Sequence, residues 1–225
     1  MVNEKELVGV AAAQHVEDGM VVGLGTGSTA YYLITELGRR MKEEGLNFTG
    51  VPTSIQSADL ASSLNIPIAS LNDIPKIDLT IDGTDEFDPQ LNGIKGGGGA
   101  HLIEKIIAVN SECVIWICDH SKQVDQLGAF PLPVEVIPAA SQHLFYAFEA
   151  KSYAPSFRLM PDGTKFVTDS GNFIIDLHLE KIADATKLAE ELIQMVGVVE
   201  HGLFLGIADK VLMANKGQVE EFEKY

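Results

Sequence analysis

The segment Met20-Val21-Val22-Gly23-Leu24-Gly25-Thr26-Gly27-Ser28-Thr29-Ala30 decides the fold, because closely spaced glycines join a short apolar strand to a helix. We predict the strand over residues 20–24 and the helix over about 29–43. Glycine lets the backbone approach a ligand closely, and the N–H groups at a helix N-terminus favour an anion. Ser28 and Thr29 add hydroxyl donors. The segment therefore predicts an α/β unit whose turn can bind a negatively charged group.

Two other interpretations of this turn stay open. Residues 25–30 fit G-x-G-x-x-A, a variant of the dinucleotide fingerprint. The acidic residue that would bind the ribose is missing, because the second strand ends in Gly50-Val51-Pro52-Thr53, and this disfavours a nicotinamide-type cofactor. The other interpretation is a tight turn from strand to helix that binds no ligand.

The alternation of strand and helix extends on both sides of this segment. A helix begins at the capping-box-like Asn3-x-x-Glu6 and runs to about Val16. Further along the chain, we predict strands at 48–51, 77–81 and 113–118, and helices at 53–63 and 100–109. This pattern indicates an α/β fold with a doubly wound, Rossmann-like parallel sheet, whose active edge lies at the carboxyl ends of the strands.

After Lys122 the pattern becomes strand, helix, two strands, helix and strand, which is the order of a ferredoxin-like α+β unit. We predict strands at 131–138, 156–159, 172–177 and 197–205, and helices at 141–151 and 182–195. A strand at 208–214 returns to the first sheet. We therefore expect a Rossmann-like catalytic domain over residues 1–130 and 207–225, and a smaller ferredoxin-like domain over 131–206.

Composition and charge narrow the class of protein. The chain has 16 Lys and Arg residues against 32 Asp and Glu, a net charge of −16, which argues against nucleic acid and anionic membranes as partners. A small anionic substrate would need a local electropositive pocket. No apolar run approaches the roughly 18 residues of a membrane span, and the N-terminus has no apolar signal core. Cys113 and Cys118 point to opposite faces of one strand, so we expect free thiols and a reducing cytoplasm.

Four acidic residues crowd the segment Asp82-Gly83-Thr84-Asp85-Glu86-Phe87-Asp88, directly after a predicted buried strand. A solvated turn is one interpretation. A calcium loop is another, but the spacing and the terminal glutamate of an EF-hand do not fit. Carboxylates at the carboxyl end of a strand lie where α/β proteins place their active sites. Asp82 is the best placed, because it is the first residue after the strand.

Four consecutive glycines follow Lys95 in the segment Lys95-Gly96-Gly97-Gly98-Gly99-Ala100-His101-Leu102-Ile103-Glu104-Lys105. Ordering so many glycines costs conformational entropy, and a nest of N–H groups around an oxyanion explains them better than a flexible linker. Glu104 lies early in the following helix and points back toward this loop. Taken alone, it is more often a partner of the helix dipole than a catalyst.

The three segments described above and four others occur in one order over about Lys5 to Ala214. The seven segments are GLGTGST, DGTDEFD, KGGGGA, DHSK, PLPVEV, TDSGNFIID and GVVEHGLF. Together they resemble the A-type ribose-5-phosphate isomerases. The resemblance implies a cytoplasmic enzyme of the non-oxidative pentose phosphate pathway that interconverts D-ribose 5-phosphate and D-ribulose 5-phosphate through an enediolate. It also implies a homodimer or homotetramer with contacts through the smaller domain, and no metal or nucleotide cofactor.

The resemblance also implies roles for individual residues. Glu104 would be the base that moves a proton between C2 and C1, and Lys95 with the loop N–H groups would stabilise the oxyanion. Asp82 and Asp85 would contact the sugar hydroxyls and assist ring opening. The phosphate would lie at the turn after the first strand, near Lys122 and, with less support, Lys5. The implied substrate-binding residues are Lys5, Thr26, Gly27, Ser28, Thr29, Asp82, Gly83, Thr84, Asp85, Lys95, Gly96, Gly97, Gly98 and Lys122.

Some residues depart from the family pattern. His101, Ile103 and Ser170 stand where leucine, arginine and asparagine are more usual. His101 and Glu104 are three residues apart on one helix, so a metal pair is conceivable, but no further ligands are evident. The other histidines are expected at the surface or its boundary. Burial would raise the pKa of Glu104 and the helix N-terminus would lower it, and the sequence does not decide between them. A sugar-phosphate sensor without turnover is the alternative function.

Overall fold

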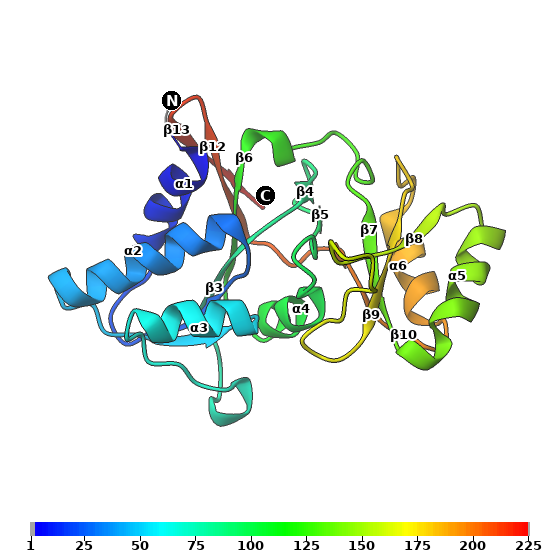
Figure 1. Ribbon diagram of the computed structural model, residues 1–225. Coiled ribbons are helices and arrows are strands. Elements are labelled where there is room, and N and C mark those ends of the chain that lie inside the picture. Colours follow the sequence, from blue (N-terminus) through cyan, green and yellow to red (C-terminus); the bar gives the residue numbers. More distant parts are fainter. Residues whose placement is uncertain (1–2, 225) are drawn as a thin grey trace.

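The computed structural model describes residues 3–224, and two larger sheets and one small sheet organise them. Figure 1 shows the larger sheets side by side, with helix α4 (His101–Val109) between them. Helix α4 contacts strand β3 (Leu79–Gly83) of the first sheet and β10 (Val198–His201) of the second. No helix of this part of the chain is long and apolar enough to cross a membrane.

The six-stranded sheet has the order β13-β12-β6-β3-β1-β2, and all neighbours are parallel except β12 and β13. Strand β1 lies between β2 and β3. The chain crosses from β1 to β2 on one side and then from β2 back past β1 to β3 on the other, which creates a topological switch point at the carboxyl ends of β1 and β3. The predicted parallel α/β sheet is confirmed. Its remaining strands are β1 (Val21–Leu24), β2 (Thr49–Pro52), β6 (Val114–Asp119), β12 (Lys210–Asn215) and β13 (Gln218–Glu223).

Within residues 3–224, three α-helices precede β3 in the chain. They are α1 (Glu4–Ala13), α2 (Ser28–Glu44) and α3 (Ile55–Ser63). The side chains of Asn3 and Ser54 cap α1 and α3 by accepting from Glu6 N–H and Ser57 N–H. Helix α1 ends at Ala13 rather than at the predicted Val16, and a short turn leads on to β1.

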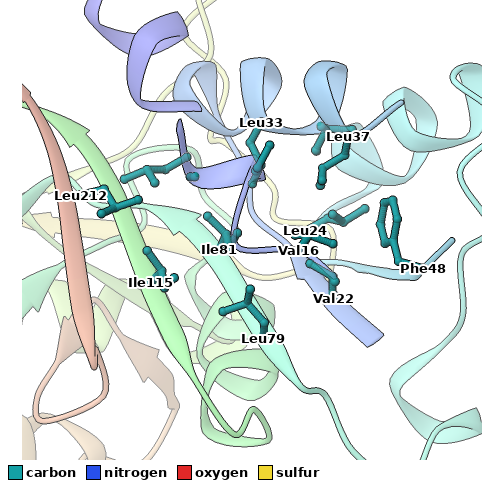
Figure 2. Close-up of a cluster of buried hydrophobic side chains, with 14 of the residues drawn as sticks. Val16, Val22, Leu24, Leu33, Leu37, Phe48, Leu79, Ile81, Ile115 and Leu212 are labelled. Carbon is teal, nitrogen blue, oxygen red and sulfur yellow. The ribbon is translucent and has the colours of Figure 1, made fainter. Parts of the chain in front are cut away.

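A large apolar core fills the space between the six-stranded sheet and helices α1 and α2. Figure 2 shows Leu33 and Leu37 of α2 directed toward Leu24 and Ile81 of the sheet. All four side chains are essentially inaccessible to solvent. Burial of a leucine-sized side chain contributes about 1.5–3 kcal/mol, so this core holds α2 firmly against the strands whose ends form the site.

The second sheet has the order β10-β7-β9-β8 with all pairs antiparallel, and α5 and α6 cover one of its faces. This is the predicted ferredoxin-like arrangement. Side chains alternate between the two faces of a strand. Ile175 of β9 therefore packs against these helices, while Ile174 and Asp176 point to the opposite face of the sheet. Its elements are β7 (Leu132–Val136), α5 (Ser141–Ala150), β8 (Pro155–Phe157), β9 (Phe173–Leu177), α6 (Ala185–Ile193) and β10.

The predicted strand region at 197–205 consists of two strands, because the chain divides there into β10 and β11 (Leu203–Phe204). Strand β11 pairs with β5 (Gly93–Ile94), which pairs with β4 (Glu86–Phe87) to complete the small sheet. Gly202 makes the change of sheet possible, since a Cβ there would lie 2.4 Å from the Lys95 carbonyl oxygen. The small sheet thus holds the backbone of Lys95, whose N–H donates to Gly202 O at 2.9 Å.

Candidate active site

A cavity of about 270 Å³ opens at the switch point, at the carboxyl ends of β1 and β3. Every predicted site residue except Asp82 lines it. The lining comprises Lys5, Thr26, Gly27, Ser28, Thr29, Gly83, Thr84, Asp85, Lys95, Gly96, Gly97, Gly98, Glu104 and Lys122. Residues from five separate sequence segments therefore meet around one space.

Lys95 is at the centre of a buried group of charges. Its Nζ lies 3.0 Å from Asp82 Oδ2 and 3.5 Å from Glu104 Oε2, and all three side chains are at most 5% exposed. Nζ also donates to Gly83 O at 2.5 Å. Burial lowers the pKa of Lys95, but Asp82 and Glu104 more than offset this, so its pKa is raised. Lys95 is consequently a fixed cation at the edge of the cavity.

Asp82 lies beneath the cavity at the end of β3. Its Oδ1 accepts from the N–H groups of Thr26, at 2.9 Å, and Gly83, at 2.7 Å. The close approach explains the glycine before Thr26, because a Cβ on Gly25 would lie 2.2 Å from Asp82 Oδ1. Burial raises the pKa of Asp82, while Lys95 and the two N–H donors oppose the rise. Asp82 thus ties the turn after β1 to β3 and holds Lys95 in place.

Glu104 lies in the first turns of α4, and its carboxylate faces Lys95. Within residues 3–224, its Oε2 atom has no hydrogen-bond donor of normal geometry. Burial raises the pKa of Glu104 to about 8; Lys95 opposes this change, and Asp82 and Asp85 add to it. Burial therefore outweighs the opposing influence of Lys95, and the pKa of Glu104 is raised. A carboxylate with such a pKa is suited to accept and return a proton near neutral pH.

The glycine loop turns sharply between Lys95 and α4. Gly96 and Gly99 adopt φ angles of +108° and +82°, which favour glycine, and Gly99 N–H donates to Gly96 O at 2.9 Å. Asp85 Oδ2 accepts from Gly97 N–H at 2.7 Å. Our prediction treated the N–H groups of Gly96, Gly97 and Gly98 alike, but the Gly97 N–H is already engaged. Across residues 3–224 the Gly98 N–H has no acceptor, and Gly98 lines the cavity.

The opposite end of the cavity is cationic. Lys5 of α1 donates to Ser28 Oγ at 2.9 Å, and Lys122 lines the same space from the short 3₁₀ turn after β6. Helix α2 begins here behind Gly27, which has a φ of +101° and makes no side-chain cap. The N–H groups at the N-terminus of α2, a hydroxyl and two ammonium groups together form a suitable binding site for a phosphate.

His101 does not line the cavity: its ring packs behind Gly96, whereas the Glu104 carboxylate faces Lys95. Its Nε2 atom is 3.8 Å from Glu135 Oε2 on β7, and the ring is inaccessible to solvent. Burial lowers the pKa of His101 to about 3, so the ring is neutral. In residues 3–224, Glu4, Asp119 and His120 are the one group of three or more side chains that could hold a metal ion, and it does not include His101 or Glu104. His201 is also buried, whereas we expected it at the surface or boundary.

The second sheet reaches the glycine loop through Arg158, which the sequence analysis did not identify. Its Nη1 atom donates to Gly96 O at 2.6 Å and to Gly97 O at 3.2 Å. Arg158 is more than 50 residues from the loop in sequence, and no local motif marks it. Only the packing of the second sheet against the loop reveals the contact.

A buried carboxylate and ammonium group beside a cavity with a cationic end are the arrangement expected of an enzyme that moves protons on a small anionic substrate. The family model of ribose 5-phosphate isomerase A (phosphoriboisomerase A) matches residues 49–218. The ribose-5-phosphate isomerase A of Streptococcus thermophilus is 58% identical over 97% of both chains. The chain therefore belongs to the ribose 5-phosphate isomerase A family, and it is an aldose–ketose isomerase.

Solved structures agree with this assignment. Ribose 5-phosphate isomerase A of Methanocaldococcus jannaschii has a TM-score of 0.93 at 42% identity, and the match covers 98% of both chains. A D-ribose-5-phosphate isomerase in complex with phospho-erythronic acid has a TM-score of 0.95 at 39% identity, covering 99% of this chain and 100% of that one. The whole fold, including both larger sheets, is thus shared with these isomerases.

Proposed function

We propose that the cavity at the switch point is where this chain interconverts D-ribose 5-phosphate and D-ribulose 5-phosphate, with Glu104 as the base. The observation that carries this proposal is the buried Glu104 carboxylate, which lines the cavity 3.5 Å from the Lys95 ammonium group. The relative that binds phospho-erythronic acid adds support, because this ligand pairs a carboxylate with a phosphate. A carboxylate resembles an enediolate in its planar pair of oxygens.

Glu104 removes the C2 proton of the open-chain aldose and returns a proton to C1 of the enediolate. Over the same steps the C1 carbonyl oxygen gains a proton and the C2 hydroxyl loses one, so the overall reaction balances without an oxidant. Lys95 and the Gly98 N–H are positioned to stabilise the negative charge that develops on the oxygens. A preorganised donor of this kind contributes about 2.7–4 kcal/mol to the transition state.

The remaining lining residues hold the two ends of the sugar. Lys5, Ser28, Thr29 and Lys122 bind the phosphate, which fixes the reacting carbons relative to Glu104. Asp85 lines the cavity and contacts the sugar hydroxyls during ring opening. Asp82 lies beneath the cavity, so its part in ring opening is exerted through Lys95 and the turn at Thr26.

Several broader features belong to the same proposal. The reaction uses no metal and no nucleotide. The enzyme works in the cytoplasm as a homodimer or homotetramer, with residues 131–206 as the smaller domain that makes the subunit contacts. The two free cysteines support a reducing compartment.

The decisive experiment measures turnover and binding separately. Wild-type protein is mixed with ribose 5-phosphate and the formation of ribulose 5-phosphate is followed, while calorimetry with Glu104→Gln measures binding without turnover. An isomerase gives rapid product formation in the wild type and retained binding in the variant. Binding without any product in the wild type would instead identify the alternative, a sugar-phosphate sensor.

A further inference from the structure

Arg158 follows strand β8 and joins the second sheet to the glycine loop. Its Nε atom donates to Asp176 Oδ2 at 3.0 Å and its Nη2 atom to Asp176 Oδ1 at 2.5 Å, so the guanidinium and the carboxylate form a fork. Both side chains are about 15% exposed. The third nitrogen, Nη1, donates to the carbonyl oxygens of Gly96 and Gly97.

The backbone of Arg158 is also fixed. Its N–H donates to Ile174 O and its carbonyl oxygen accepts from Phe166 N–H, each at 2.9 Å. Strand β8 pairs Ser156 with Asp176 of β9, so Arg158 and Asp176 point to the face of the sheet that is turned toward the loop. The backbone hydrogen bonds and the Asp176 carboxylate therefore fix the position of the guanidinium relative to the glycine carbonyl groups.

This contact decides which way the loop peptides face. In a planar trans peptide the C=O and N–H groups point in opposite directions. Because Arg158 draws the carbonyl groups of Gly96 and Gly97 toward itself, the N–H groups of Gly97 and Gly98 point away from it. The first N–H meets Asp85 at 2.7 Å, and the second belongs to a residue that lines the cavity.

We propose that Arg158, anchored by Asp176, is a positioning residue for the isomerase reaction, which keeps the Gly98 N–H directed at the oxyanion. Glycine peptides rotate easily, so without the guanidinium these peptides can turn and present a carbonyl oxygen to the cavity. A carbonyl oxygen would repel the enediolate. Asp176 neutralises the guanidinium, so Arg158 acts through loop geometry rather than through its charge. The inference rests on the proposed function.

The test compares Arg158→Met with wild type and with Arg39→Met, a control at an exposed arginine of α2 that pairs only with glutamates of its own helix. We expect kcat to fall about 100-fold in Arg158→Met, because a small displacement of an oxyanion donor costs that much. KM should change less than about threefold, since the phosphate end is untouched. Arg158→Lys, which can satisfy a carbonyl oxygen but cannot form the fork, should lie between the two.

Inhibitor binding separates positioning from general stability. Phospho-erythronic acid should bind Arg158→Met more weakly by nearly the factor lost in kcat/KM, while inorganic phosphate should bind as in wild type. A kcat within twofold of wild type in folded Arg158→Met, or equal weakening of both inhibitors, would overturn the inference. If Arg158→Met does not fold, the same kinetic and inhibitor measurements are made on Asp176→Asn, and the same two results would overturn the inference. Failure of the proposed function is distinct, because wild type would then form no ribulose 5-phosphate.

Discussion

Lys95 and Glu104 form an unequal buried pair: the Lys95 Nζ atom lies 3.5 Å from Glu104 Oε2 but 3.0 Å from Asp82 Oδ2. Asp82 also accepts two backbone hydrogen bonds, which Glu104 lacks. The ammonium group therefore favours the charged form of Asp82 more than that of Glu104. Glu104 consequently keeps its proton to a higher pH than an ordinary glutamate does, and this gives the reaction a defined pH dependence.

The acidic limb of kcat/KM should reflect this pKa. Because a base must be deprotonated in order to act, and burial raises the pKa of Glu104 to about 8, we expect kcat/KM to rise with pH through about 8. The measurement is kcat/KM from pH 5 to 9.5 at constant ionic strength. A limb near pH 4.5, the value of an exposed glutamate, would contradict the assignment.

The same shift predicts how stability depends on pH. Unfolded chains release the Glu104 proton near pH 4.5, whereas the folded protein keeps it until about pH 8. The folded state is therefore favoured below that window, and this contribution is lost as pH rises through it. In urea titrations at pH 5 and 9, Glu104→Gln should lose less stability than wild type between the two values. Equal losses would show that Glu104 titrates normally in the folded protein.

Glu104→Gln should fold normally and lose turnover by several orders of magnitude. The amide preserves the shape of the side chain but cannot accept the C2 proton. Substrate affinity should change far less than kcat, since the lost interaction belongs to the transition state. Glu112→Gln is the matched control, because Glu112 has a side chain that is 61% exposed and lies beyond the end of α4. Turnover near the wild-type rate would remove Glu104 as the base.

Lys122→Ala should mainly raise KM, by about 10- to 100-fold, as expected for the loss of one charge-assisted hydrogen bond. The chain carries a net charge of −16, so local cations must hold the phosphate, and ribose without phosphate should be a very poor substrate. Remote binding energy also supports catalysis, so a smaller loss of kcat accompanies the change. Steady-state kinetics beside Lys42→Ala, an exposed lysine of α2, provide the comparison. Unchanged affinity for ribose 5-phosphate would show that Lys122 lies outside the phosphate site.

His101→Leu should keep most of its activity and melt at the same temperature or higher. The imidazole is buried and neutral, and its ring nitrogens have no hydrogen-bond partner of normal geometry among residues 3–224. Leucine removes this unsatisfied polar group, whose burial costs about 1–3 kcal/mol. Kinetics and thermal melting of the folded variant check both statements. Collapse of kcat here, with Glu104→Gln still active, would transfer the role of base to His101.

The sequence was sufficient to predict strands that are marked by a local run of apolar residues. The strand before Gly25 and strand β3 were both predicted within two residues, because each is a short apolar run followed by polar or glycine residues. Asp82, expected as the first residue after its strand, lies within β3, which ends at Gly83. Strand β13 was not predicted. Its sequence QVEEFE is mostly polar, and it forms an edge strand because β12 offers it a partner. Strands β4 and β5 were missed for a different reason, since each has only two residues and shows no periodic pattern.

The residues of the site likewise divide into those that a local motif indicates and those that only the packing of distant segments reveals. Its glycine turns, Lys95 and Glu104 lie in compact motifs, so the sequence indicated them. The engagement of Gly97 by Asp85, the position of Asp82 beneath the cavity and the contact of Arg158 depend on packing between distant segments. The pKa of Glu104 depends on how far burial exceeds the opposing influence of Lys95, and this requires the three-dimensional arrangement.

The position of β12 in the chain has a consequence for folding during synthesis. Strand β12 is the parallel neighbour of β6, but about 90 residues separate them in the chain, and the ferredoxin-like unit lies within that interval. At a synthesis rate of about 5–20 residues per second, β6 waits roughly 5 to 20 seconds on the ribosome before its partner emerges. During that time its edge is open, and an open edge can recruit strands from other nascent chains. Slow folding of the intervening unit would prolong this exposure, because β12 follows it in the chain, so mutations that slow its folding should lower the yield of active enzyme in cells even where the catalytic residues are intact.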